Sequence, residues 1–210
     1  MAKISWSRCF LMLLWLSCSA FPLRAGDAAG HEPIVVAVNN RAGISAKTLA
    51  GAEERAKRIF SKAGVEVEWI NCGESAAEAE LCHEARCPQR LELTIAPRSR
   101  NLKDSVLGIS FVDRGGGCYG AVFLQPVEQI QRQAKLELGT MLGHVFAHET
   151  AHLLLGENSH SEQGIMRAHW NERELEEARR GALLFTPEEG QVMRSKVLER
   201  LSHGGSEAGR

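Results

Sequence analysis

His148-Glu149-Thr150-Ala151-His152 is the stretch around which the rest of this chain can be interpreted. Its two histidines are four residues apart, so on an α-helix they project from one face about a turn apart and can bind one metal ion. Glu149 stands beside the first histidine, where a carboxylate can reach a metal-bound water. The H-E-x-x-H pattern therefore predicts a zinc site on a helix, with Glu149 as general base.

The segment that carries this motif is the longest periodic stretch of the chain. After Pro126, apolar residues recur at steps of three and four from Ile130 to Leu155, which predicts a long helix with both motif histidines on its inward stripe. His144 stands one further step of four before His148. Eight residues turn a helix ~80° beyond two full turns, so three such histidines cannot share one ion. We expect His144 to be a helix-surface residue or to support the ligands.

A catalytic zinc takes three protein ligands and keeps a fourth position open. Gly156 ends the periodic stretch, as a capping glycine does, and His160 follows eight residues after His152. A chain that reverses at Gly156 can return His160 to the metal, and Gly164-Ile165-Met166 then supplies a turn with a methionine. The alternative third ligand is Glu172, in an Asn-Glu pair twenty residues after His152.

Taken together, these residues resemble the metzincins, zinc endopeptidases in which H-E-x-x-H is followed by a helix-ending glycine, a third histidine and a methionine-containing turn. The sequence is also similar to small exported bacterial proteins with H-E-x-x-H-L-L-L-G and then H-S-x-x-G-I-M. The resemblance covers roughly residues 33–170 and implies His148, His152 and His160 as ligands, with Gly156 and Met166 in supporting roles.

The spacing departs from the typical metzincin pattern, because Gly156 and His160 lie one and two residues late. The rival pattern is that of the thermolysin-like gluzincins, in which Glu172 would be the third ligand. We favour His160 because Gly156 and Met166 accompany it, whereas Glu172 belongs to an acid-rich run typical of a solvated helix.

The resemblance also implies a mechanism, in which zinc polarises the scissile carbonyl while Glu149 takes a proton from the zinc-bound water and passes it to the leaving amine. Residues 108–112 would form the sheet-edge strand that pairs with an extended substrate. His169 is a candidate for transition-state stabilisation or a supporting contact. The alternative is a catalytically inactive, secreted, zinc-stabilised binding module, with His169 as fourth ligand. The presence of Glu149 favours the enzyme.

Runs of β-branched and alternating apolar residues predict five strands, and a capped amphipathic segment predicts a helix after the first. Thr186-Pro187-Glu188-Glu189 starts a C-terminal helix. The expected fold is α+β, with a metzincin-like mixed five-stranded sheet, a backing helix, a long active-site helix, a methionine turn and a C-terminal helix. The predicted strands are 33–38, 65–70, 91–95, 105–112 and 119–124, the last two joined by a turn over 113–117, and the predicted backing helix is 46–63.

The N-terminus has the features of a secretory signal peptide. A basic start is followed by the apolar run Cys9–Leu16 and small residues up to Ala20. The run is well short of the ~20 residues of a membrane-spanning helix. With cleavage after Ala20 or Ala25, we expect an exported protein, periplasmic or extracellular, with a signal peptide over 1–25, a peptidase domain over 26–203 and a disordered tail over 204–210.

The four cysteines beyond this segment are Cys72, Cys82, Cys87 and Cys118. An even set in an oxidising compartment predicts two disulfides, with three possible pairings. A cysteine metal site that includes His83 is the alternative.

The charge of the chain argues against a polyanionic partner. Cleavage after Ala25 removes three basic residues and no acid, which leaves 22 basic against 26 acidic residues and a net charge of −4. No basic run interleaved with aromatic residues is present, so we expect no nucleic acid, and no membrane contact after cleavage. We expect a monomer with one catalytic Zn²⁺ that binds a peptide or protein substrate in extended form.

Overall fold

The computed structural model describes residues 32–73, 82, 87–103 and 105–204. The predicted signal peptide, all of the predicted tail over 204–210 except Gly204, and most of the segment from Cys72 to Arg90 lie outside these residues. The elements in chain order are β1 (Ile34–Asn40), α1 (Ala46–Lys62), β2 (Val67–Asn71), β3 (Arg90–Ala96), β4 (Gly108–Asp113), β5 (Gly116–Phe123), α3 (Leu124–Ala134), α4 (Leu138–Leu155), α5 (Glu172–Arg180) and α6 (Pro187–Gly204).

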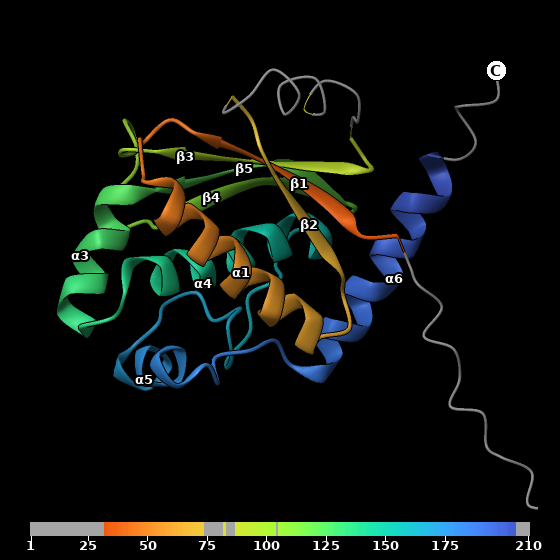
Figure 1. The fold of residues 1–210 in the computed structure, drawn as a ribbon. Helices are drawn as coiled ribbons and strands as arrows, with labels where there is room; N and C mark the ends of the chain where they lie inside the picture. The colour runs from red at the N-terminus through yellow and green to blue at the C-terminus, as the bar shows by residue number, and fades with distance from the viewer. Residues whose placement is uncertain (1–31, 74–81, 83–86, 104, 205–210) are drawn as a thin grey trace, which may run out of the picture. The chain divides into compact units, whose positions relative to one another are not determined.

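The five strands form one mixed sheet in the order β2-β1-β3-β5-β4. Strands β2, β1, β3 and β5 are parallel to one another, and β4 pairs antiparallel to β5 at the end of the sheet. Helices α1 and α4 lie side by side on one face of the sheet (Figure 1). The predicted α+β class and mixed five-stranded sheet are confirmed.

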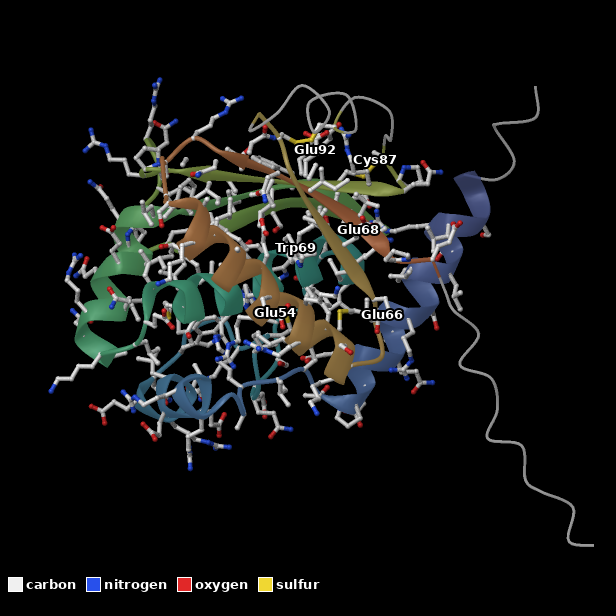
Figure 2. The ribbon with its side chains drawn as sticks, viewed as in Figure 1. Glu54, Glu66, Glu68, Trp69, Cys87 and Glu92 are labelled. Carbon is white, nitrogen blue, oxygen red and sulfur yellow. A yellow bond between two sulfur atoms is a disulfide. The ribbon has the colours of Figure 1, made fainter. Side chains whose placement is uncertain are left out.

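The core lies between this face and the two helices. Alternate residues of β1, Ile34, Val36 and Val38, are buried there, as the period of a strand requires. Trp69 of β2 lies on the helix side of the sheet, with its ring 5.7 Å from that of Phe146 of α4, whereas Glu92 points to the other side (Figure 2). Burial of these apolar side chains fixes which face of the sheet receives α4.

The long periodic stretch after Pro126 is two helices rather than one. It breaks at Lys135, which has the left-handed φ of 52°. The Leu136 and Lys135 amides donate to the Gln131 and Arg132 carbonyls, a Schellman pattern that satisfies the carbonyls at the end of α3. Glycine usually occupies this position, so a lysine gives the break no clear sequence signal.

The β4–β5 hairpin turn is shorter than predicted, because Gly116 already belongs to β5. A Cβ on Gly116, which has a φ of 105°, would lie 2.5 Å from the Leu153 carbonyl oxygen at the end of α4. This glycine therefore permits the hairpin to lie directly against α4 rather than only to turn the chain.

Two disulfides join Cys72 to Cys82 and Cys87 to Cys118, as the even cysteine count predicts. The second bond connects the segment before β3 to β5. None of the described helices is both long and apolar enough to cross a membrane.

Arg200 of α6 connects three parts of the fold, although only 7% of it is exposed. Its guanidinium donates to the carbonyls of Pro88, Gly117 and Leu153 at 3.2, 2.9 and 2.7 Å. Arg200 thereby links the segment before β3 to the β4–β5 hairpin and to the end of α4.

We expect Arg200→Ala to lower the free energy of unfolding by about 2–4 kcal/mol, because one buried and two partly buried carbonyls lose their donor. Chemical denaturation of the oxidised, metal-free protein measures this loss. The matched control is Arg194→Ala on the same helix, an exposed arginine that donates to one carbonyl, that of Ala63. Equal losses in the two variants would show that Arg200 is no more important than a surface arginine.

Candidate metal centre

Helix α4 places both motif histidines at the margin of the core, where each is partly buried. Thirteen of its 18 residues are buried, so the helix is held by packing on nearly all sides. Close approach to α1 depends on Gly143, where a Cβ would lie 2.7 Å from the Ala52 carbonyl oxygen. This packing fixes the rotation of α4 and hence the direction of His148 and His152.

The orientation of the His148 imidazole is set by the methionine turn. Its Nδ1 lies 2.7 Å from the Ile165 carbonyl oxygen, which can only accept, so Nδ1 carries the proton and Nε2 presents a lone pair. Trp170 also donates to this carbonyl through Nε1, at 3.1 Å, and its ring stands edge-on to His148. The turn and the tryptophan together orient the first candidate ligand.

Ser159 performs the same role for His152. The Ser159 hydroxyl donates to the Gly156 carbonyl at 2.8 Å, so its oxygen accepts from His152 Nδ1 at 2.7 Å. The His152 Nε2 atom is therefore also unprotonated in the neutral ring.

His160 reaches the same point although its loop is longer than in the typical pattern. Gly156 and Asn158 both have positive φ, 86° and 57°, and these two positions reverse the chain after α4. The Glu157 amide donates to the Asp113 carbonyl at 3.0 Å, which ties the loop to the β4–β5 hairpin. The extra length is thus taken up by two left-handed residues.

The three Nε2 atoms converge. The distances from His152 Nε2 to His148 Nε2 and to His160 Nε2 are 3.0 and 3.1 Å, close to the ~3.3 Å expected between nitrogens of a tetrahedral zinc site. Burial lowers the pKa of His148 to about 4, and burial with the two neighbouring histidines lowers that of His152 to about 3. Converging lone pairs repel one another unless a cation lies between them, so this donor set fits a metal ion, and its nitrogen chemistry suits zinc.

Glu149 lies next to His148 on α4, and its side chain is directed toward the edge strand β4. The Ser110 hydroxyl lies 2.9 Å from Glu149 Oε2 and 2.9 Å from the Glu149 carbonyl oxygen. A Cβ on Gly108 would lie 2.5 Å from Oε1, so a larger residue here would require the Glu149 side chain to move. Burial raises the pKa of Glu149 to about 7, and the Ser110 hydrogen bond acts against this shift.

Sequence reasoning included Gly108 and Ser110 in the predicted substrate strand over 108–112 but missed their contact with Glu149, and it missed the role of Ser159. Ser110 and Gly108 are about forty residues before the motif, so no local pattern connects them to Glu149. Ser159 had a local signal, because it directly precedes His160 and metal-binding histidines commonly have a hydrogen-bond partner for their second nitrogen.

The remaining predicted site residues have different positions. Met166 is fully buried in the turn from Gly164 to Arg167, whose ends are joined by a hydrogen bond. Glu172 is exposed at the start of α5 and does not belong to the cluster of His148, His152 and His160. His169 is exposed on the wall of the cleft.

His144 is fully buried, so the prediction that it is a helix-surface residue is wrong. Its Nδ1 donates to the Thr140 carbonyl, and its ring stands edge-on to Trp170, which also contacts His148. Helix packing, rather than metal binding, accounts for its burial.

A cavity of about 570 Å³ opens onto the three histidines and Glu149. One wall is β4 with the segment before it, and the other is the chain from Gly156 to Trp170. Apolar residues continue the lining away from the histidines, namely Leu107, Ile109, Ile130, Val145 and Trp170.

The sequence matches no family model and no curated protein. Among solved structures, a zinc-dependent peptidase from Methanocorpusculum labreanum superposes with a TM-score of 0.51 and 13% identity, over 75% of this chain and 99% of that one. Archaemetzincin from Methanopyrus kandleri gives a TM-score of 0.49 and 14% identity, over 80% and 97% of the two chains. At this identity, the first similarity shows a shared fold.

We expect Ser159→Ala to weaken zinc binding by about 10- to 100-fold, because His152 loses the partner that orients its ring. Competition with a chromophoric chelator measures the affinity. Ser161→Ala is the control, since the Ser161 hydroxyl donates to the Gln163 carbonyl. An unchanged affinity in Ser159→Ala would mean that the ring is oriented without this hydrogen bond.

The two candidate third ligands can be separated by metal analysis. We expect His160→Ala to lose most of its zinc and Glu172→Ala to keep it, because the cluster contains the His160 nitrogen and Glu172 is exposed. The measurement is the zinc content of each variant after dialysis against a weak chelator. The reverse pattern would assign the ligand role to Glu172.

Proposed function

We propose that this protein is an exported zinc-dependent endopeptidase, with His148, His152 and His160 as ligands and Glu149 as general base. One observation carries the proposal, namely that three converging Nε2 atoms share an open cleft with a buried carboxylate. Three protein ligands with an accessible fourth side are the arrangement of a catalytic zinc rather than a structural one.

One solved structure supports this proposal as well, because the protein from Methanocorpusculum labreanum with the shared fold is a zinc-dependent peptidase. Export is supported by the signal-like N-terminus and by the two disulfides, which form and persist in oxidising compartments.

Bound zinc would supply a Lewis acid that polarises the scissile carbonyl and acidifies water. Glu149 accepts the proton of the attacking water and passes it to the leaving amine, while Ser110 holds Oε2 so that the carboxylate keeps one orientation. Gly108 and Ser110 lie on the edge strand, which can hold an extended peptide by backbone hydrogen bonds.

A zinc-stabilised binding module has less support. A purely structural zinc normally has four protein ligands. In the described part of the chain the metal-compatible cluster contains three histidines, and His169 is outside it. No observation in the structure favours this second function over hydrolysis.

We expect Glu149→Gln to keep its zinc and to reduce peptide cleavage by about 10²- to 10⁴-fold, because the amide cannot accept the proton. The measurement is cleavage of a mixed peptide library by the zinc-loaded chain from residue 26, with zinc content determined on the same sample. Cleavage at the wild-type rate by a zinc-loaded variant would exclude Glu149 as the base.

A further inference from the structure

Two aromatic side chains are exposed next to each other on β4 and β5. Phe111 is 63% exposed and Tyr119 is 53% exposed, and they are paired directly across the two strands. The other exposed large apolar residues of the described chain are Leu102, Val192 and Leu198, and none of them lies in the sheet. Single exposed apolar residues are ordinary, but an adjacent aromatic pair indicates a contact surface. We call Phe111 and Tyr119 the aromatic ledge.

The ledge lies on the face of the sheet that turns away from α4. Ser110 points toward α4, since its hydroxyl contacts Glu149. Successive side chains of a strand point to opposite faces, so Phe111 points the other way. The ledge is therefore separate from the walls of the metal cleft, although it is on the same strand.

Among the described strands β4 is the edge strand, and its outer side presents backbone groups beside the candidate metal centre. The Phe123 amide donates to the Leu107 carbonyl at 2.8 Å, which makes Leu107–Phe123 a hydrogen-bonded pair. In an antiparallel ladder such pairs alternate, so the backbone groups of Gly108 and Ser110 point away from β5. Because β4 ends the sheet, an extended peptide can pair with these groups.

A peptide that pairs with β4 passes from the cleft to the ledge within a few residues. Val112 lines both the cleft and a second hollow of about 660 Å³, which is bounded by the ledge, the hairpin turn and α6. A strand advances ~3.3 Å per residue, so Ser110 and Val112 are roughly 7 Å apart along the edge. The peptide residue opposite Phe111 has its side chain on the same face as the ledge, within contact distance.

We propose that the aromatic ledge is a specificity site for an apolar side chain of an extended substrate, a few residues from the scissile bond. The proposal rests on the proposed peptidase function for the position of that bond. Charge gives no strong competing preference, because the hollow contains both acidic and basic groups, with Lys196 paired to Glu199 at 3.2 Å. Contact with two aromatic rings therefore favours leucine, isoleucine, valine, methionine or phenylalanine over serine or aspartate.

The test uses fluorescent peptides of about ten residues that carry one leucine, moved stepwise through an alanine–serine background. With the wild-type, zinc-loaded chain, leucine at one position distant from the cut raises kcat/KM about 10-fold over serine at that position. In Phe111→Ser/Tyr119→Ser this ratio falls to about 1. In the control Val192→Ser, which changes an exposed apolar residue of α6 outside both hollows, the ratio stays near 10.

Peptide binding separates this proposal from the proposed catalysis. Fluorescence anisotropy with the zinc-loaded Glu149→Gln chain should give the same approximately 10-fold preference in Kd, lost when the ledge is also replaced. If the wild type cleaves nothing but this preference is present, the ledge stands and the peptidase function fails. If cleavage occurs and the ledge variant keeps the leucine preference, the ledge proposal is overturned alone.

Two further outcomes also overturn the ledge proposal. One is the absence of any preference both in cleavage and in binding. The other is a dimer in light scattering that dissociates on Phe111→Ser/Tyr119→Ser, since the ledge would then be the contact between two copies of this chain.

Discussion

The hydrogen bond from His148 Nδ1 to the Ile165 carbonyl is the interaction on which the candidate site depends. It fixes the protonated nitrogen of the ring and thereby turns the Nε2 lone pair toward His152 and His160. The same carbonyl receives the Trp170 indole. One backbone oxygen of the methionine turn therefore orders both a candidate ligand and the wall beside it. The buried Met166 and Ile165 side chains hold that turn in the core.

The second constraint is the burial of a carboxylate. Glu149 is 5% exposed, and an ionised acid in such surroundings is costly unless hydrogen bonds or a cation compensate. The Ser110 hydroxyl supplies one hydrogen bond, and the metal that the histidines can hold would supply positive charge. The features therefore depend on one another, because three neutral imidazoles and a buried acid fit together better around a cation than without one.

The sequence predicts the parts of this molecule whose signals are local. Helix α1, the strands and the start of α6 follow from periodicity and capping, as in the reciprocal contacts between Thr186 and Glu189. The motif on an inward helix face is local as well. His160 stays a predicted ligand. The sequence supports it less directly than His148 and His152, because the loop before it is longer than in the typical metzincin pattern. The structure shows how left-handed Gly156 and Asn158 take up that difference. The break at Lys135 had no glycine to mark it, the cysteine pairing was one of three equal possibilities, and the contact of Ser110 with Glu149 depends on tertiary packing.

Gly108 has a consequence for other chains of this fold. A side chain at this strand position cannot coexist with a carboxylate placed like that of Glu149, because the two occupy the same space. The Gly-Ile-Ser run at 108–110 and the distant glutamate thus form one unit, although no element of local structure joins them. A chain that keeps both histidines of the helix but has a bulky residue at the glycine position must hold the side chain of its acid in a different orientation. A glycine at this position of the edge strand is therefore a feature, beside the histidine spacing, that suits a sequence to this geometry.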